Sequence, residues 1–246
     1  MQRSALPSRL TAAATLSVAL VFTAACAKKA APAVQDGPNH IIVTAQDYSF
    51  TAPDSISAGL EMFHLVNNGP SIHHLQLVQL DSGKTVGDLV DALKNPGPPP
   101  AWAHFIGGPN AVPPTGKDTA IAYLTLAAGN YAMLCMVPDS AGVPHFEKGM
   151  FRALTVTPSA ATPAAAPQAD VVIHLKDYEF DVDPTGALTP GPHMIRVVND
   201  GPQTHEMLLV QMAPGKKAMD MVNWIERDKK RGRKRLSLSK IGRAHV

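Results

Sequence analysis

The most informative segment of this 246-residue chain is Cys135-Met-Val-Pro-Asp-Ser-Ala-Gly-Val-Pro-His145-Phe-Glu-Lys-Gly-Met150. It places a thiol, an imidazole and a thioether on one short segment that also contains Pro and Gly. A second imidazole ends the upstream segment Asn67-Asn-Gly-Pro-Ser-Ile-His73. Two imidazoles, one thiolate and a weak thioether are the ligand types of trigonal copper–thiolate sites that transfer electrons. His73, Cys135, His145 and Met150 are therefore candidate ligands of one metal ion.

Runs of strand-forming residues surround these candidate ligands. The runs are short and apolar, and Gly, Pro, Asn and Asp separate them; they cover residues 40–44, 61–66, 75–80, 120–126, 131–135 and 151–156. Such a pattern predicts an all-β sandwich of two sheets. Residues 85–94 have apolar side chains at helical spacing, which predicts one helix. The Pro-rich residues 95–114 are expected to form a long surface connection without regular structure.

Strand geometry distinguishes the two neighbouring histidines. Side chains alternate between the faces of a strand, so His73 shares a face with Leu75 and Leu77, whereas His74 shares a face with Gln76. We therefore expect His73 to point into the apolar layer and His74 to point to water.

The order of the candidate ligands, one His followed by Cys, His and Met on a single loop, resembles the type 1 copper signature of the cupredoxins. This resemblance implies a Greek-key β-sandwich over residues 40–157 that binds one copper ion. It also implies ligation by His73, Cys135 and His145, with Met150 as the weak axial ligand. Met133 and Met136 lie nearby, and the loop position favours Met150. The implied role is to carry single electrons between redox protein partners.

The residues beside the candidate thiolate bear on enzyme activity. Leu134 and Met136 flank Cys135, whereas the multicopper oxidases and copper nitrite reductases that this loop resembles carry His residues there for a catalytic copper. We therefore expect no enzyme activity. Two other functions stay open: a periplasmic copper-binding or delivery protein, and a metal-free cupredoxin-like interaction module.

The N-terminal residues predict export. Arg3 and Arg9 precede and flank a short apolar run, and Phe22-Thr-Ala-Ala-Cys26 follows it. This pattern is typical of a secretory signal peptide over residues 1–26, too short in its apolar part to span a bilayer. Small residues before Cys26 resemble the bacterial lipobox, which implies acylation of Cys26. Residues 27–39 would then tether the protein to the periplasmic face of the outer membrane. An ordinary signal peptide and a soluble periplasmic protein are the alternative.

The two cysteines support the metal hypothesis. If Cys26 carries lipid, Cys135 has no partner in an oxidising compartment, and an unpaired thiol in an exported protein needs an explanation. Ligation to a metal supplies one, because the metal holds the thiolate in place. A disulfide between Cys26 and Cys135 is the alternative.

The sequence repeats itself after an Ala/Pro linker at residues 158–169. Asp177-Tyr-Glu-Phe repeats Asp47-Tyr-Ser-Phe, and Val198-Asn-Asp-Gly-Pro-Gln-Thr-His205 repeats Val66-Asn-Asn-Gly-Pro-Ser-Ile-His73. Matches this dense predict a partial second copy of the first module. We call residues 40–157 the first module and residues 170–225 the second segment. The alignment pairs His205 with His73, and the second segment has no Cys.

The final residues, 226–246, are strongly basic. They hold nine Lys/Arg and two Asp/Glu, against a net charge of +2 for the whole chain, so the remainder is acidic. The last six residues, Ile241-Gly-Arg-Ala-His-Val246, look like the translation of a sequencing adapter. We interpret the tail as an artefact of a truncated gene rather than a nucleic-acid site. An exported protein meets no DNA, and we expect membrane contact through the lipid anchor only.

Overall fold

The computed structural model describes residues 37–223, except Pro96, Thr115, Lys117, Pro163, Thr204, Leu208, Val210 and Gln211. Among these described residues, the first module contains nine strands, one α-helix and one 3-10 helix. These are β1 (Asn39–Gln46), β2 (Ser49–Thr51), β3 (Ser55–Ser57), β4 (Gly59–Asn67), β5 (Gln76–Leu80), α1 (Val86–Leu93), β6 (Ala103–Gly107), β7 (Thr119–Leu126), β8 (Gly129–Leu134), η1 (His145–Lys148) and β9 (Phe151–Thr157).

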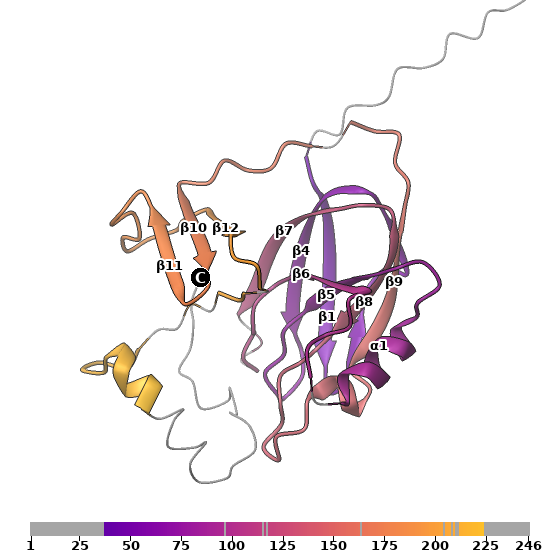
Figure 1. Ribbon diagram of the computed structural model, residues 1–246, viewed down its shortest axis with the longest axis horizontal. Helices are drawn as coiled ribbons and strands as arrows, with labels where there is room; N and C mark the ends of the chain where they lie inside the picture. The colour runs from indigo at the N-terminus through magenta and orange to yellow at the C-terminus, as the bar shows by residue number, and fades with distance from the viewer. Residues whose placement is uncertain are drawn as a thin grey trace, which may run out of the picture. The chain divides into compact units, whose positions relative to one another are not determined.

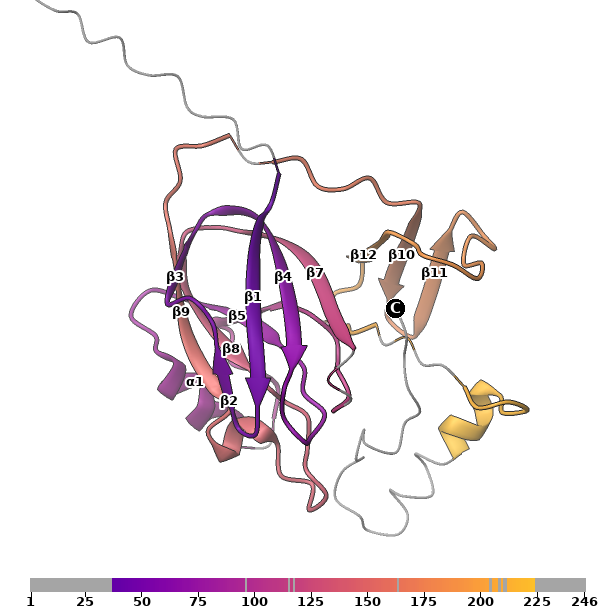
Figure 2. The same cartoon turned by 180° about the vertical axis from the view of Figure 1, so that it is seen from behind.

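These strands form two mixed sheets. One has the order β2-β1-β4-β7, which Figure 2 shows facing the viewer, and the other has the order β3-β9-β8-β5-β6. The chain crosses repeatedly from one sheet to the other, as a Greek-key sandwich requires. β1 and β4 pair in parallel, while β4–β7, β5–β8 and β8–β9 pair antiparallel. The predicted all-β sandwich is confirmed.

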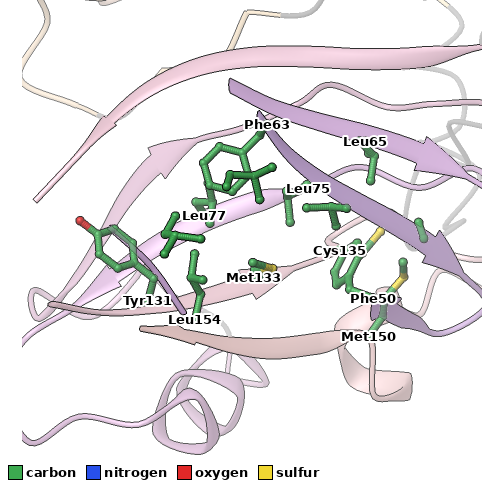
Figure 3. Packing of buried hydrophobic residues seen from close by; sticks show 14 of the residues in the cluster. Phe50, Phe63, Leu65, Leu75, Leu77, Tyr131, Met133, Cys135, Met150 and Leu154 are labelled. Carbon is green, nitrogen blue, oxygen red and sulfur yellow. The ribbon is translucent and has the colours of Figure 1, made fainter. Parts of the chain in front are cut away.

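The core lies between the two sheets. β1 buries every second residue, Ile41, Val43 and Ala45, which is the pattern of a strand with one face in the core. Figure 3 shows side chains from both sheets meeting in this layer, with Phe63 and Leu77 near its middle and Cys135 and Met150 at one end. The candidate ligands thus extend the apolar core at one pole of the sandwich.

The second face of the five-stranded sheet is covered by α1 (Figure 1). Leu89 and Val90 of the helix are buried against this face, which explains why β8 buries its residues on both sides. Thr85 caps the helix in a capping box, since its side chain accepts from the backbone N–H of Asp88 and Asp88 accepts in return. The predicted helix is confirmed, with Thr85 and Lys94 as its caps.

The prediction for the Pro-rich connection is wrong in part. Residues 103–107 form β6, which pairs antiparallel with β5 at the edge of its sheet. The strand is only five residues long and Pro and Gly flank it, so its local sequence resembles a loop. Pairing with β5, which is distant in sequence, supplies the hydrogen bonds that make it a strand.

The second segment contains β10 (Val171–Lys176), β11 (Glu179–Asp183) and β12 (Ile195–Asn199), in the order β11-β10-β12. β10 pairs antiparallel with β11 and parallel with β12, as β1 does with β2 and β4. The register agrees as well: Leu175 lies opposite Asn199, as Ala45 lies opposite Asn67.

Several predictions concern residues outside the described range. They are the signal peptide, the acylated Cys26, most of the tether and the basic tail at residues 226–246. Across the part of the chain that the structure describes, we find no helix with the length and hydropathy needed to cross a membrane.

Candidate metal centre

Three of the four candidate ligands come from one loop that its own backbone holds together. Cys135 follows β8 directly, His145 opens η1, and Met150 precedes β9. The N–H of Cys135 donates to the carbonyl of Met150 at 3.1 Å, and the N–H of Met150 donates to that of His145 at 3.0 Å. The N–H of Phe146 donates to the carbonyl of Cys135 at 2.8 Å. The three ligand positions are therefore fixed relative to one another.

His73 reaches the same place from the segment before β5. It forms a two-way backbone bridge with Val112, and its side chain is fully buried. Leu75 and Leu77 are buried on the same side. The prediction that His73 points into the apolar layer is confirmed.

The ligand atoms form a compact triangle. Nδ1 of His73 lies 3.1 Å from Nδ1 of His145, and Sγ of Cys135 lies 3.9 Å and 3.5 Å from these two atoms. A point in the plane of such a triangle lies about 2 Å from all three corners, close to the roughly 2.0–2.3 Å over which N and S ligands bind metals of this size. His73, Cys135 and His145 form the one cluster with metal-ligand spacing among the described residues. Their donor atoms suit one copper ion.

Asp47 holds His73 from behind. Its Oδ1 accepts a hydrogen bond from Nε2 of His73 at 2.7 Å, and Ser71 donates to the same carboxylate through its hydroxyl. A proton on Nε2 leaves the lone pair of Nδ1 facing the centre, as in carboxylate–histidine–metal arrangements. Sequence reasoning missed this role. The available signal was the repeat, because Asp47 stands in the duplicated Asp-Tyr-x-Phe motif and Asp177 binds His205 at 2.7 Å in the same way.

The repeated Asn-x-Gly-Pro motif serves this aspartate–histidine contact. A Cβ on Gly69 would lie 2.9 Å from Oδ1 of Asp47 and 3.0 Å from Nε2 of His73, so only glycine leaves room. The side-chain oxygen of Asn67 accepts from the N–H of Gly69 and sets the turn. In the second segment, a Cβ on Gly201 would lie 2.7 Å from Oδ1 of Asp177 and 2.8 Å from Nε2 of His205.

The prediction that His74 points to water is wrong. The side chain is half-buried, and its Nε2 accepts a hydrogen bond from the backbone N–H of Met136 at 2.7 Å. Strand alternation correctly places it opposite His73, but the chain returning after Cys135 covers that side as well. His74 therefore supports the backbone next to Cys135.

The electrostatics favour neutral imidazoles and a protonated thiol when no metal is bound. Burial, and to a smaller extent the nearby His73, lowers the pKa of His145 to about 4. Burial also lowers the pKa of His73, although Asp47 opposes this shift. Burial raises the pKa of the Cys135 thiol to about 11. Hydrogen bonds from Ser71 and His73 outweigh the effect of burial on Asp47 and lower its pKa overall. Neutral imidazoles have a free lone pair for a cation, and a cation bound here would replace the proton of the thiol.

The three methionines near the centre differ in position. Met150 is fully buried in the core layer that contains Cys135, and Figure 3 shows both sulfur atoms at the same end of that layer. Met133 lies in the middle of the layer, and Met136 packs in the cluster under α1. Met150 therefore remains our choice for the axial ligand.

Comparisons with known proteins find structural likenesses only. No family model matches the sequence, and no curated protein matches it. Reduced auracyanin from Roseiflexus castenholzii is 17% identical with a TM-score of 0.35, covering 50% of this chain and 99% of that chain. Auracyanin A, a "blue" copper protein from Chloroflexus aurantiacus, is 22% identical with a TM-score of 0.35, covering 49% and 100%. Rusticyanin from Thiobacillus ferrooxidans is 18% identical with a TM-score of 0.34, covering 48% and 76%. Each of these three proteins is similar to about half of this chain.

Proposed function

We propose that the first module binds one type 1 copper ion and carries single electrons between redox partner proteins. The observation that carries this proposal is the triangle formed by Nδ1 of His73, Sγ of Cys135 and Nδ1 of His145. Met150 would complete the set as a weak fourth ligand. Bound copper supplies a one-electron couple, and the chain supplies a fixed, apolar ligand frame around it.

The burial of the ligands favours electron transfer over copper delivery. The side chains of His73, Cys135 and Met150 are fully buried, and His145 is 1% exposed. A delivery protein has to pass its metal to another protein, which a closed centre opposes. Electrons need no such opening, and a fixed frame keeps the rearrangement between the two oxidation states small. Leu134 and Met136 beside the thiolate offer no imidazole for a second copper, so we propose a carrier rather than an enzyme.

The cellular setting is part of the same proposal. We propose export through residues 1–26 and anchoring by lipid on Cys26, at the periplasmic face of the outer membrane. The partners would then be redox proteins in that compartment and not nucleic acid. Labelling with radioactive palmitate, compared between the native chain and Cys26→Ser, tests the anchor.

The second segment fits a partial copy of the first module in this proposal. Its strand order, its register and its Asp177–His205 contact match those of the first module. It has no cysteine, so we expect it to bind no type 1 copper.

A visible spectrum of the copper-loaded protein tests the function. A strong thiolate-to-Cu(II) absorption that is lost in Cys135→Ser and in His73→Ala, together with reversible one-electron titration, supports the proposal. The matched control is His205→Ala, which removes the equivalent histidine of the second segment and should leave the band unchanged. Weak colour with tight Cu(I) binding would favour delivery, and no copper binding would favour an interaction module.

A further inference from the structure

The two imidazoles of the centre are held in different ways. Nε2 of His73 is fixed by its hydrogen bond to Asp47. Among the described residues, the polar contacts of the His145 ring are those of Nδ1, the nitrogen that faces the centre, with His73 and Cys135. The orientation of the His145 ring must therefore be set by packing.

Tyr48 provides that packing. Its ring meets the His145 ring edge-on, with centroids 4.8 Å apart and planes at 65°, a favourable geometry for aromatic pairs. Because Tyr48 follows Asp47 directly, one dipeptide contacts both imidazoles: Asp47 binds His73 and Tyr48 packs on His145. Tyr48 is half-buried, whereas His145 is almost fully covered.

Tyr48 is in turn held by Lys148. The ammonium lies 4.7 Å from the centroid of the Tyr48 ring and donates to its hydroxyl at 3.2 Å. Lys148 also forms an ion pair with Asp139. Asp139 accepts hydrogen bonds from the backbone N–H groups of Ala141 and Val143, which order the tip of the ligand loop. The contacts thus run from the loop tip through Lys148 to Tyr48 and then to the metal ligand.

The second segment offers a comparison, because none of its described residues packs on the equivalent tyrosine as the ligand loop packs on Tyr48. Asp177 binds His205 as Asp47 binds His73, yet Tyr178, the equivalent of Tyr48, is fully exposed. The aspartate–histidine contact therefore forms without the tyrosine being packed. Tyr48 packs on His145 and Lys148, which both belong to the ligand loop.

We propose that Tyr48 is the positioning residue of His145, held in place by Lys148, and that it closes this side of the metal centre to water and small anions. For the copper-loaded protein the inference rests on the proposed function. For the metal-free protein it rests only on packing: the Tyr48 ring packs on His145, whose Nδ1 lies 3.5 Å from Sγ of Cys135, so the ring would also shield this thiol. We call the Tyr48 ring the lid.

The metal-free experiment measures how fast a small thiol reagent, methyl methanethiosulfonate, modifies Cys135 in the full chain, with Cys26→Ser to remove the other thiol. Tyr48→Ala should raise the rate about tenfold, because it removes an aromatic contact and a cation–π contact that hold the lid closed. Tyr48→Phe, which keeps the ring, should restore most of the protection. Tyr178→Ala is the matched control and should leave the rate unchanged. Equal rates in Tyr48→Ala and Tyr178→Ala would overturn the proposal.

The copper-loaded experiment measures whether azide changes the visible band. We expect no change in the native chain or in Tyr48→Phe, and a shifted band in Tyr48→Ala. If Tyr48→Ala does not fold, as judged by circular dichroism, Lys148→Met replaces it and should show smaller changes of the same kind. A Lys148→Met variant with the native modification rate and no band shift in azide would refute the role proposed for Tyr48. Failure of the native chain to bind copper would count against the proposed function, while the thiol experiment would still decide the role of Tyr48.

Discussion

Asp47 is hydrogen-bonded to the candidate ligand His73 but is not itself a candidate ligand, so Asp47→Asn tests how the metal centre depends on this support. The Oδ1 atom of Asp47 lies 2.7 Å from Nε2 of His73, whose side chain is fully buried. Asparagine has the same shape but no charge, so it holds the ring less firmly and makes Nδ1 a weaker donor. Losing such a carboxylate partner typically costs about 10- to 100-fold in metal affinity. This corresponds to about 1.4–2.7 kcal/mol of binding free energy.

Competition with a chelator of known copper affinity measures this loss, with the visible band reporting occupancy. The matched control is Asp177→Asn, which removes the same charge from the equivalent contact with His205. We expect Asp177→Asn to bind copper like the native chain and Asp47→Asn to retain the band at lower affinity. If the two variants bind copper equally well, Asp47 does not tune His73 and the argument from its hydrogen bond is wrong.

Three further predictions follow from contacts near the centre. Gly69→Ala should lower both the melting temperature and the copper affinity, because the new methyl group would clash with Asp47 and His73. The control is Gly87→Ala, whose Cβ would have its nearest neighbour at 3.6 Å, and it should lower neither. His74→Ala should keep the visible band but reduce the free energy of unfolding by about 1 kcal/mol, since it leaves the partly buried N–H of Met136 without this acceptor. Loss of the band would make His74 a ligand. For the metal-free protein, burial lowers the pKa of His145 from 6.5 to about 4. Between these pH values the unfolded chain binds more protons than the folded chain, so the free energy of unfolding should fall as the pH falls from 6.5 to 4. The contribution of this group is about 3 kcal/mol. Urea unfolding at several pH values in this range measures how the free energy of unfolding depends on pH. The same pH dependence in His145→Gln would contradict its assignment to His145.

The sequence predicted the sandwich and the inward histidine because both depend on local periodicity. Alternating burial in β1 and the helical spacing in α1 are set by neighbours along the chain, and the core simply uses them. His73 was found for the same reason, since it continues the buried face of Leu75 and Leu77.

The parts that sequence reasoning missed depend on contacts between distant segments. β6 is a strand because β5 pairs with it. His74 is covered because the chain returns past it after Cys135 and offers the N–H of Met136. The role of Asp47 needed the turn at Gly69 to bring it against His73. The periodicity of the sequence does not predict these contacts between distant segments.

The backbone ties among Cys135, His145 and Met150 separate the ligand loop into two parts with different tolerance to change. Pro138 and Pro144 face each other across a bridge, and Asp139 and Val143 are joined by a backbone hydrogen bond inside it. Residues beyond that bond form a tip that no ligand depends on directly. Insertions between Ser140 and Gly142 that keep the Asp139–Lys148 ion pair could therefore lengthen the loop and alter its surface while the three ligand positions stay in register. A longer loop can thus change the surface at this end of the first module without rebuilding the centre.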